Sequence, residues 1–382
     1  MDKEVWLKPV QVFDGARLRH DCVLRVADGL VDVFDQAPDG ANVRSMKATV
    51  TPGFVDLQVN GGGGVLVNQT PTRNGLMQIA DAHRKFGTVA VMPTVITDTP
   101  QVIAAAADAA IAADGTHGIV GLHIEGPHIA QDKRGTHDGD LVRMMSDDTL
   151  DVVGKLRRAG VVVKLTLAPE AATPAQIAQL VKMGAIVSIG HTNAKAEAVR
   201  AALDAGASCF THLFNAMSQM EGREAGAVGT AINSDAYCGI ICDGHHVNDA
   251  MIGLAIRARP VPDRMFLVSD AMPSVGGPDQ FSLYGQTITL KGGKLINADG
   301  NLAGAHVAQA QGVQRLVKHV GLSLEAALCM AISVPAALIQ QPALASLVGR
   351  GVGDVLCLDA ACNVIGTLDA VLEQGEDNND GA

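Results

Sequence analysis

Aromatic residues make up only 3% of this 382-residue chain, and no apolar stretch in it is long enough to cross a membrane. A membrane-spanning helix needs roughly 20 consecutive apolar residues. Residues 1–10 also lack a basic segment followed by a long apolar core, so no secretory signal peptide is expected. These absences argue against any association with a membrane.

The seven cysteines are scattered and contain no CxxC pair. This pattern gives no disulfide framework and favours a reduced, cytoplasmic protein. The net charge is −11, and no cluster of lysine and arginine with interleaved aromatic residues occurs. Nucleic acid is therefore not an expected partner, and an anionic small substrate would need local positive groups.

What the sequence does have, from Thr51 onward, is an alternation of short apolar runs with alanine-rich, helix-like stretches. Eight runs are candidate core strands: GFVDLQV, GTVAVMPT, GIVGLHIE, GVVVKLTLA, AIVSIGH, ASCFTH, YCGIICD and MFLVSD. Strands that alternate with helices predict a parallel α/β fold. Eight units that end near residue 275 favour a (β/α)8 TIM-like barrel over an open sheet.

The two ends of the chain have an all-β character instead. Residues 1–50 contain short strand-like pieces, and GDVLCLDA and ACNVIGT near the C-terminus resemble them. We expect residues 1–50 and 345–382 to form one small β-sandwich domain beside a barrel of residues 51–344. Residues 281–303 look like an inserted hairpin with KGGK as its turn.

Five apolar runs end in an ionisable residue: GIVGLHIE at Glu125, AIVSIGH at His191, ASCFTH at His212, YCGIICDGHH at His246 and RMFLVSD at Asp270. Catalytic groups of a (β/α)8 barrel lie where the strands end, at the C-terminal face. Residues that are far apart in the sequence are therefore expected to meet around one opening.

Glu125, His191 and His212 together form a typical metal-ligand set. Two imidazoles and one carboxylate leave a coordination position for water, and a divalent metal lowers the pKa of that water toward about 7. The alternative is that each residue is a satisfied polar group at a strand end. Because that explanation would have to hold at three strand ends, we favour the metal site.

Asp270 is a candidate general base, since a carboxylate beside an activated water can take its proton. Its alternative role is a helix N-cap, but the following residues AMPSVGG do not look like a helix start. His245 and His246 are adjacent, so their side chains point apart and at most one should face the site. The residues alone do not choose between them.

Other candidates are weaker. His137 lies in the polar loop DKRGTHDGD, where it could contact a ligand or be solvated. Asn215 and Arg223 lie in THLFNAMSQMEGREAG and could hold phosphate oxygens, although Arg223 alone would more often be a surface charge. The glycine run Gly61–Gly64 lacks a phosphate-loop motif and is interpreted as a tight turn.

Ten ordered motifs resemble the N-acetylglucosamine-6-phosphate deacetylases of the amidohydrolase superfamily: TPGFVDLQVNGGGG, GLHIEGPHI, KRGTH, LAPE, IGHTNA, THLFNAM, GREAG, YCGIICDGHHV, LVSDAMP and LAGA. The resemblance runs nearly end to end. It implies a barrel with a β-sandwich from both chain ends, and hydrolysis of N-acetylglucosamine 6-phosphate to glucosamine 6-phosphate and acetate. It also implies a homodimer in which the arginine reaches across the interface in some members.

The resemblance further implies a role for each matching residue. Glu125, His191 and His212 match the metal ligands, Asp270 the catalytic acid/base and His246 the histidine that contacts the substrate. The sugar and phosphate contacts match His137, Asn215, Ala216 and Arg223, and Leu302, Ala303, Gly304 and Ala305 would line the pocket. The ion would be one divalent metal per subunit, zinc first, with iron, cobalt and manganese also suited to the ligand set.

Three positions depart from the usual pattern. Many amidohydrolases place His-x-His at the end of the first strand, whereas Gln58-Val59-Asn60 stands here. Amides bind zinc-like ions poorly, which predicts a single-metal enzyme. His128 and His306 stand where other residue types are usual and could alter acyl or sugar tolerance. Two alternatives remain, a deacetylase of the galactosamine isomer and a non-catalytic scaffold.

Overall fold

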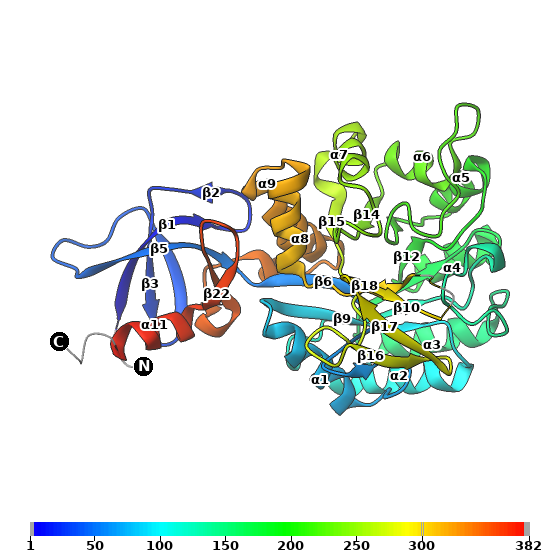
Figure 1. Cartoon of the computed structure of the whole chain (residues 1–382), viewed down its shortest axis with the longest axis horizontal. Coiled ribbons are helices and arrows are strands. Elements are labelled where there is room, and N and C mark those ends of the chain that lie inside the picture. Colours follow the sequence, from blue (N-terminus) through cyan, green and yellow to red (C-terminus); the bar gives the residue numbers. More distant parts are fainter. Residues whose placement is uncertain (1–3, 299, 301, 378–382) are drawn as a thin grey trace.

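All eight predicted core strands are present in the computed structural model, which describes residues 4–298, 300 and 302–377 (Figure 1). They are β6 (Phe54–Val59), β9 (Thr88–Ile96), β10 (Leu122–Glu125), β11 (Val163–Leu167), β12 (Ile186–Ile189), β13 (Cys209–Phe210), β14 (Tyr237–Ile240) and β15 (Met265–Leu267). The strands are parallel and neighbours in chain order. A bridge between Val59 and Ala271 joins the two edges, so the predicted barrel is confirmed.

Helices follow the strands around the barrel. They are α1 (Arg73–Arg84), α2 (Pro100–Ala113), α3 (Asp147–Arg158), α4 (Pro174–Lys182), α5 (Ala196–Asp204), α6 (Gly226–Ile232), α7 (Asp249–Ala258) and α8 (Gln309–Arg315). Thr72, Thr99 and Thr173 cap α1, α2 and α4 by accepting a backbone N–H, and α2 and α4 begin with proline. These sequence signals fix where the helices start.

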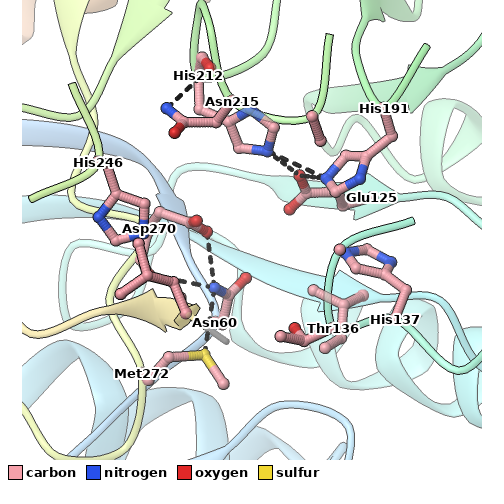
Figure 2. Close-up of a pocket in the computed structure, with 15 residues that line it drawn as sticks. Asn60, Glu125, Thr136, His137, His191, His212, Asn215, His246, Asp270 and Met272 are labelled. Atoms are coloured by element: carbon pink, nitrogen blue, oxygen red, sulfur yellow. Dashed lines mark hydrogen bonds and ion pairs between the residues drawn. The ribbon is translucent and has the colours of Figure 1, made fainter. Parts of the chain in front are cut away.

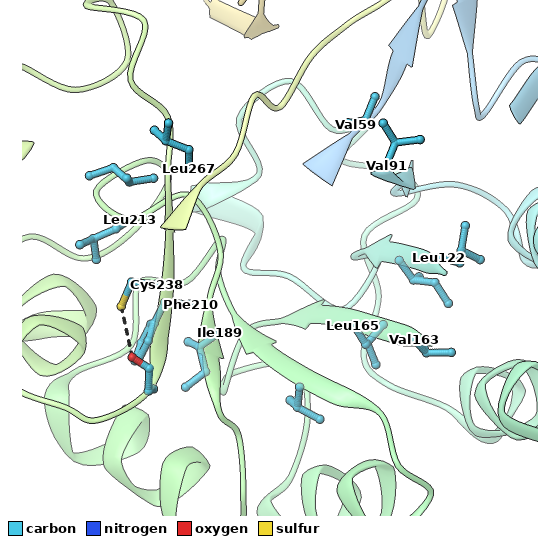
Figure 3. Packing of buried hydrophobic residues seen from close by; sticks show 14 of the residues in the cluster. Val59, Val91, Leu122, Val163, Leu165, Ile189, Phe210, Leu213, Cys238 and Leu267 are labelled. Carbon is cyan, nitrogen blue, oxygen red and sulfur yellow. Dashed lines mark hydrogen bonds between the residues drawn. The ribbon is translucent and has the colours of Figure 1, made fainter. Parts of the chain in front are cut away.

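Along β11, alternation separates apolar residues that face outward from polar residues that face the interior. Val163 and Leu165 of β11 pack in the main apolar cluster with residues such as Leu122 and Ile189 (Figure 3). The residues between them, Lys164 and Thr166, are fully buried as well. Because successive side chains of a strand point to opposite faces, they face the barrel axis.

Hydroxyl groups and an imidazole surround Thr166 in that interior. Thr166 Oγ1 lies 2.7 Å from His123 Nε2 and 2.6 Å from Thr211 Oγ1, which in turn lies 2.6 Å from Ser188 Oγ. Lys164 Nζ has no hydrogen-bond partner among the described residues. A network of hydrogen-bonded side chains therefore lies inside the barrel, below the strand ends that carry the site.

Asp56 in this interior should make stability depend on pH. Burial raises its pKa from 3.8 to about 7, more than the hydrogen bonds from Ser269 and Gln58 lower it. Between these values the folded protein holds a proton that the unfolded chain has released, so stability falls as pH rises. Between pH 5 and pH 8 this titration should lower the free energy of unfolding of the wild type by about 3 kcal/mol, and Asp56→Asn should remove that decline. Urea unfolding of the metal-free proteins measures both. Equal slopes for the two proteins would contradict the buried titration.

Residues 280–305 form more than the expected hairpin. A four-stranded antiparallel sheet contains β16 (Gln280–Leu283), β17 (Gln286–Lys291), β18 (Lys294–Ile296) and β19 (Leu302–Ala305). Gly292 and Gly293 form the predicted turn with φ of 56° and 80°. β19 returns to the barrel, because Ala305 N–H donates to Asp270 O at 3.0 Å.

The two chain ends pair in a small sheet, as predicted. It contains β1 (Val5–Phe13), β2 (Leu18–Arg19), β3 (Val23–Ala27), β4 (Leu30–Phe34), β5 (Val43–Pro52), β20 (Arg350–Gly351), β21 (Val355–Leu358) and β22 (Val364–Thr367), which share one hydrogen-bonded network. β5 pairs antiparallel with β21 and leads directly into β6. α11 (Leu368–Asp377) lies against this sheet (Figure 1).

Between barrel and small sheet run α9 (Leu324–Leu328) and α10 (Val334–Leu338), joined by a π-helical segment at 329–333. Over the residues that the structure describes, no helix has both the length and the apolar character needed to span a membrane.

Candidate active site

A cavity of about 190 Å³ lies at the C-terminal ends of the barrel strands (Figure 2). Most of the predicted site residues line it: Glu125, His137, His191, His212, Asn215, Ala216, His246, Asp270, Leu302 and Gly304. Asn60, Ile96, Thr136 and Met272 also belong to its wall. Strand ends that are distant in the sequence thus meet at one opening.

Glu125, His191 and His212 point toward a common position (Figure 2). Glu125 Oε1 lies 3.2 Å from His191 Nε2 and 3.0 Å from His212 Nε2, and the two nitrogens are 3.1 Å apart. All three side chains are buried, and their ligand atoms lie within 4.8 Å of one another. This cluster can hold a metal ion.

The surroundings of the cluster favour a cation. His191 Nδ1 must donate to the carbonyl of Lys133, 2.8 Å away, so Nε2 is the ring nitrogen that faces the cluster. Burial raises the pKa of Glu125, but hydrogen bonds from His191 and His212 outweigh it and hold that pKa well below its usual range. A carboxylate and two inward imidazole nitrogens are a donor set that suits zinc and similar ions.

The backbone is strained where it presents these groups. His191, His212 and Asp270 have positive φ values of 47°, 29° and 52°. Non-glycine residues rarely adopt this region, and each instance costs on the order of 1–3 kcal/mol. With this backbone conformation, the side chains of His191, His212 and Asp270 point into the cavity.

Two amide side chains hold the carboxylates of the site. Gln58 Nε2 donates to Glu125 Oε2 at 3.0 Å and to Asp270 Oδ1 at 3.1 Å, and Asn60 Nδ2 donates to Asp270 Oδ1 at 2.7 Å. Burial and the charge of Glu125 raise the pKa of Asp270 despite these bonds. The Asp270 carboxyl therefore lies in the cavity wall and holds its proton more strongly than an exposed aspartate does.

His246, rather than His245, faces the cavity, as the family resemblance implied. Its Nδ1 donates to Asp243 Oδ2 at 2.7 Å, and Asp243 Oδ1 accepts the backbone N–H groups of both histidines. Burial raises the pKa of Asp243, but the bonds from His246 outweigh it and lower that pKa to about 2. The hydrogen bond to Asp243 fixes the orientation of the His246 ring.

His137 is fixed in a similar way. Its Nδ1 lies 2.7 Å from Thr97 Oγ1, and its ring packs 4.5 Å from the ring of His191. Burial lowers the pKa of His137 to about 3, so the ring is neutral at physiological pH. Thr97 also accepts a hydrogen bond at its carbonyl from the hydroxyl of Tyr284, which ties the four-stranded insert to this side of the cavity.

Asn215 and Ala216 form a turn beside His212. Phe214 and Ala216 have positive φ values of 79° and 50°. No acceptor for the N–H of Ala216 is found in the described part of the chain. Backbone N–H groups that point out of such a turn bind anions.

Several predicted residues do not reach this cavity. Ala303 and Ala305 alternate with the lining residues of β19, and they pack in two apolar clusters instead. The side chain of Arg223 is exposed, and within one copy of the chain it does not line the cavity.

The two unusual histidines also lie outside the lining. The Nδ1 of His128 is bonded to Arg143 O and its Nε2 to Thr149 Oγ1, so this residue holds a loop together. His306 faces a separate cavity and is hydrogen-bonded to Ser274 Oγ. Neither side chain is placed to set acyl tolerance by direct contact.

The sequence did not reveal the residues that hold the candidate site residues in place. Gln58 and Asn60 stood out only because they replace a metal-binding pair, yet they bond to Glu125 and Asp270. Thr97 and Asp243 gave no signal beyond their place after a strand. Contacts of this kind depend on the three-dimensional fold.

Residues 49–365 match the amidohydrolase family, and the chain belongs to this family. The N-acetylgalactosamine-6-phosphate deacetylase of Shewanella sp. (strain ANA-3) is 39% identical over 364 residues, which cover 91% of this chain and 92% of that protein. The N-acetylglucosamine-6-phosphate deacetylase of Haemophilus influenzae is 34% identical over 293 residues, covering 75% and 76%.

Solved structures agree. The N-acetylglucosamine-6-phosphate deacetylase of Pasteurella multocida superposes with a TM-score of 0.87 at 30% identity, covering 96% of this chain and 98% of that one. A mutant of the Mycobacterium smegmatis enzyme in complex with N-acetyl-D-glucosamine-6-phosphate gives a TM-score of 0.86 at 30% identity, covering 95% and 97%.

Proposed function

We propose that this protein hydrolyses the acetamide of N-acetyl-D-glucosamine 6-phosphate to D-glucosamine 6-phosphate and acetate. The observation that carries the proposal is that Glu125, His191 and His212 share one cavity with Asp270. Related enzymes with this activity support the choice of substrate. We place the reaction in amino-sugar catabolism in the cytoplasm, in keeping with seven cysteines that form no disulfide.

We assign one divalent ion, zinc first with iron, cobalt and manganese as alternatives, to Glu125, His191 and His212. When bound, such an ion polarises the amide carbonyl and acidifies a water molecule. The amide of Gln58 is bonded to Glu125 and that of Asn60 to Asp270. Because these amides hold the site carboxylates rather than a second ion, they support a site for a single ion.

Asp270 is the acid/base residue in this proposal. Its raised pKa suits a group that takes a proton from the attacking water and returns it to the departing amine. Asn60 and Gln58 hold one carboxylate oxygen, so the other remains available for the reacting atoms.

His246 stabilises the negative charge that develops on the carbonyl oxygen. Asp243 accepts the hydrogen bond from Nδ1 and so leaves Nε2 to face the cavity. A donor already oriented before the reaction costs no reorganisation when charge develops.

Asn215 and the N–H of Ala216 grip the substrate phosphate, supported by their position in the cavity wall. Because the phosphate is remote from the acetamide, holding the phosphate orients the reacting amide bond. No lysine or arginine is among the described residues that line the cavity. We therefore propose a homodimer in which Arg223 from the second copy supplies the missing positive charge.

Arg223→Ala tests this part of the proposal. We expect KM for the phosphorylated sugar to rise about ten- to a hundredfold, because one charge-assisted hydrogen bond is worth about 1.5–3 kcal/mol. Metal content should stay unchanged, and Arg158→Ala on the surface of α3 serves as the matched control. An unchanged KM would remove Arg223 from the phosphate grip.

The substrate assignment is tested by measuring amine release from three compounds: N-acetylglucosamine 6-phosphate, N-acetylgalactosamine 6-phosphate and unphosphorylated N-acetylglucosamine. We expect kcat/KM to be at least about a hundredfold higher for the phosphorylated sugar than for its unphosphorylated form. A preference for the unphosphorylated sugar would contradict the proposed grip.

A second candidate is deacetylation of N-acetylgalactosamine 6-phosphate. The 39% identity to the Shewanella enzyme favours it, and the chemistry of the metal site would be the same. The two substrates differ only at the 4-hydroxyl, so a higher kcat/KM for the galactosamine isomer in the same assay would select this candidate.

A further inference from the structure

A second cavity, of about 410 Å³, shares no lining residue with the active-site cavity. Its wall gathers His245, His306, Arg315, Lys318 and His319, although the chain has a net charge of −11. We propose that this basic cavity binds a small phosphorylated anion, and that its occupancy acts on the active site through residues 243–246.

The basic groups of this cavity have donors to spare. No side-chain hydrogen bond or ion pair is found for His245, Lys318 or His319 within the described residues. His306 uses only Nδ1, on Ser274. Arg315 uses Nε and Nη2, which leaves Nη1. Phosphate oxygens accept charge-assisted hydrogen bonds from groups of this kind.

The carboxylates in and beside the cavity are mostly engaged elsewhere. Asp243 accepts three hydrogen bonds within its own loop. Asp249 binds Arg315 through both oxygens, at 2.7 and 2.8 Å. Asp359 lies near Lys318 and accepts bonds from its own turn, and Asp279 near His306 is exposed. Of these four carboxylates, three are bonded to other groups, and Asp279 is the one left to face a free donor.

Tight packing connects the cavity wall to the loop after β14. A Cβ on Gly244, whose φ is +79°, would lie 2.2 Å from Arg315 Cζ, so the guanidinium rests directly on this backbone. A Cβ on Gly293 would lie 2.9 Å from His245 Nε2. The loop is held between the segment that begins with α8 and the turn between β17 and β18.

His245 and His246 are adjacent but face different cavities. His245 lines the basic cavity and His246 lines the active site. Asp243 Oδ1 accepts both of their backbone N–H groups, at 2.8 and 2.9 Å. An anion that draws His245 toward Lys318 and His319 therefore shifts the backbone that carries His246.

Equilibrium dialysis of the metal-loaded protein with radiolabelled inorganic phosphate tests the site. The wild type should bind one more phosphate per chain than the double variant Lys318→Ala/His319→Ala, whose two side chains are exposed. Lys182→Ala, which removes an equal charge elsewhere, should bind as the wild type does. Equal binding by wild type and double variant would overturn the proposal, whatever the substrate of the enzyme proves to be.

Two further arms define the ligand and the coupling. Displacement of the label by glucose 6-phosphate at about tenfold lower concentration than by unlabelled phosphate would mark a phosphosugar site, and the reverse an inorganic phosphate site. At saturating substrate, phosphate should change kcat by about fivefold in the wild type and not in the double variant. The same response in both proteins would overturn the coupling.

Discussion

Replacing Asp270 with asparagine should lower kcat by about two to four orders of magnitude, the usual contribution of general acid–base catalysis. An asparagine oxygen can still accept the hydrogen bond that Asn60 donates at 2.7 Å, so the pocket should keep its shape. The amide cannot take a proton from water or give one to the amine. Steady-state deacetylation kinetics measure the loss, and elemental analysis should find the same metal content as in the wild type.

Asp151→Asn, an exposed change of the same kind on α3, is the control for the Asp270 variant. It should have wild-type kcat. Near-normal turnover of Asp270→Asn at full metal content would show that another group moves the proton.

Removing a ligand should have an equally large effect by a different route. His191→Ala leaves Glu125 and His212 without a third donor, and Glu125 Oε1 loses a partner at 3.2 Å. We expect metal content after dialysis to fall below about a tenth of the wild-type value, and activity to fall with it. Mutating residues that only support metal ligands already lowers metal affinity about 10–100-fold, so losing a ligand should cost at least as much. Metal analysis and kcat/KM on the same samples measure both.

The matched change is His20→Ala, which removes an exposed histidine far from the cavity in sequence. It should keep metal and activity. If His191→Ala also kept one tightly held ion, the cluster of Glu125, His191 and His212 could not be the metal site.

The barrel was predictable because its strands are short, buried and mostly apolar runs. All eight predicted runs contain a strand, four of them end in an ionisable residue that reaches the site, and His246 follows three residues after a fifth. The end of a parallel strand has a fixed place in a barrel, so Glu125, His191, His212 and Asp270 could be assembled without knowing the helices.

Contacts between side chains were not predictable in the same way. The sequence marked Leu302–Ala305 as one lining segment, but a strand shows alternate residues to each side, so only Leu302 and Gly304 line the cavity. Gln58 and Asn60 lie on the first barrel strand and its end, and only barrel closure brings them against Asp270.

The choice between His245 and His246 shows the same limit. Alternation predicted that they point apart, but not which cavity each one faces. That depends on Asp243, which holds His246, and on Gly293, which packs against His245.

Titration of the metal-free enzyme with zinc tests the central claim most directly. If Glu125, His191 and His212 hold one catalytic ion, the chelated protein is inactive and activity rises linearly to a break at one equivalent per chain. Full activity of the protein without any metal, or a break at two equivalents, would contradict a single-ion site at the mouth of the barrel.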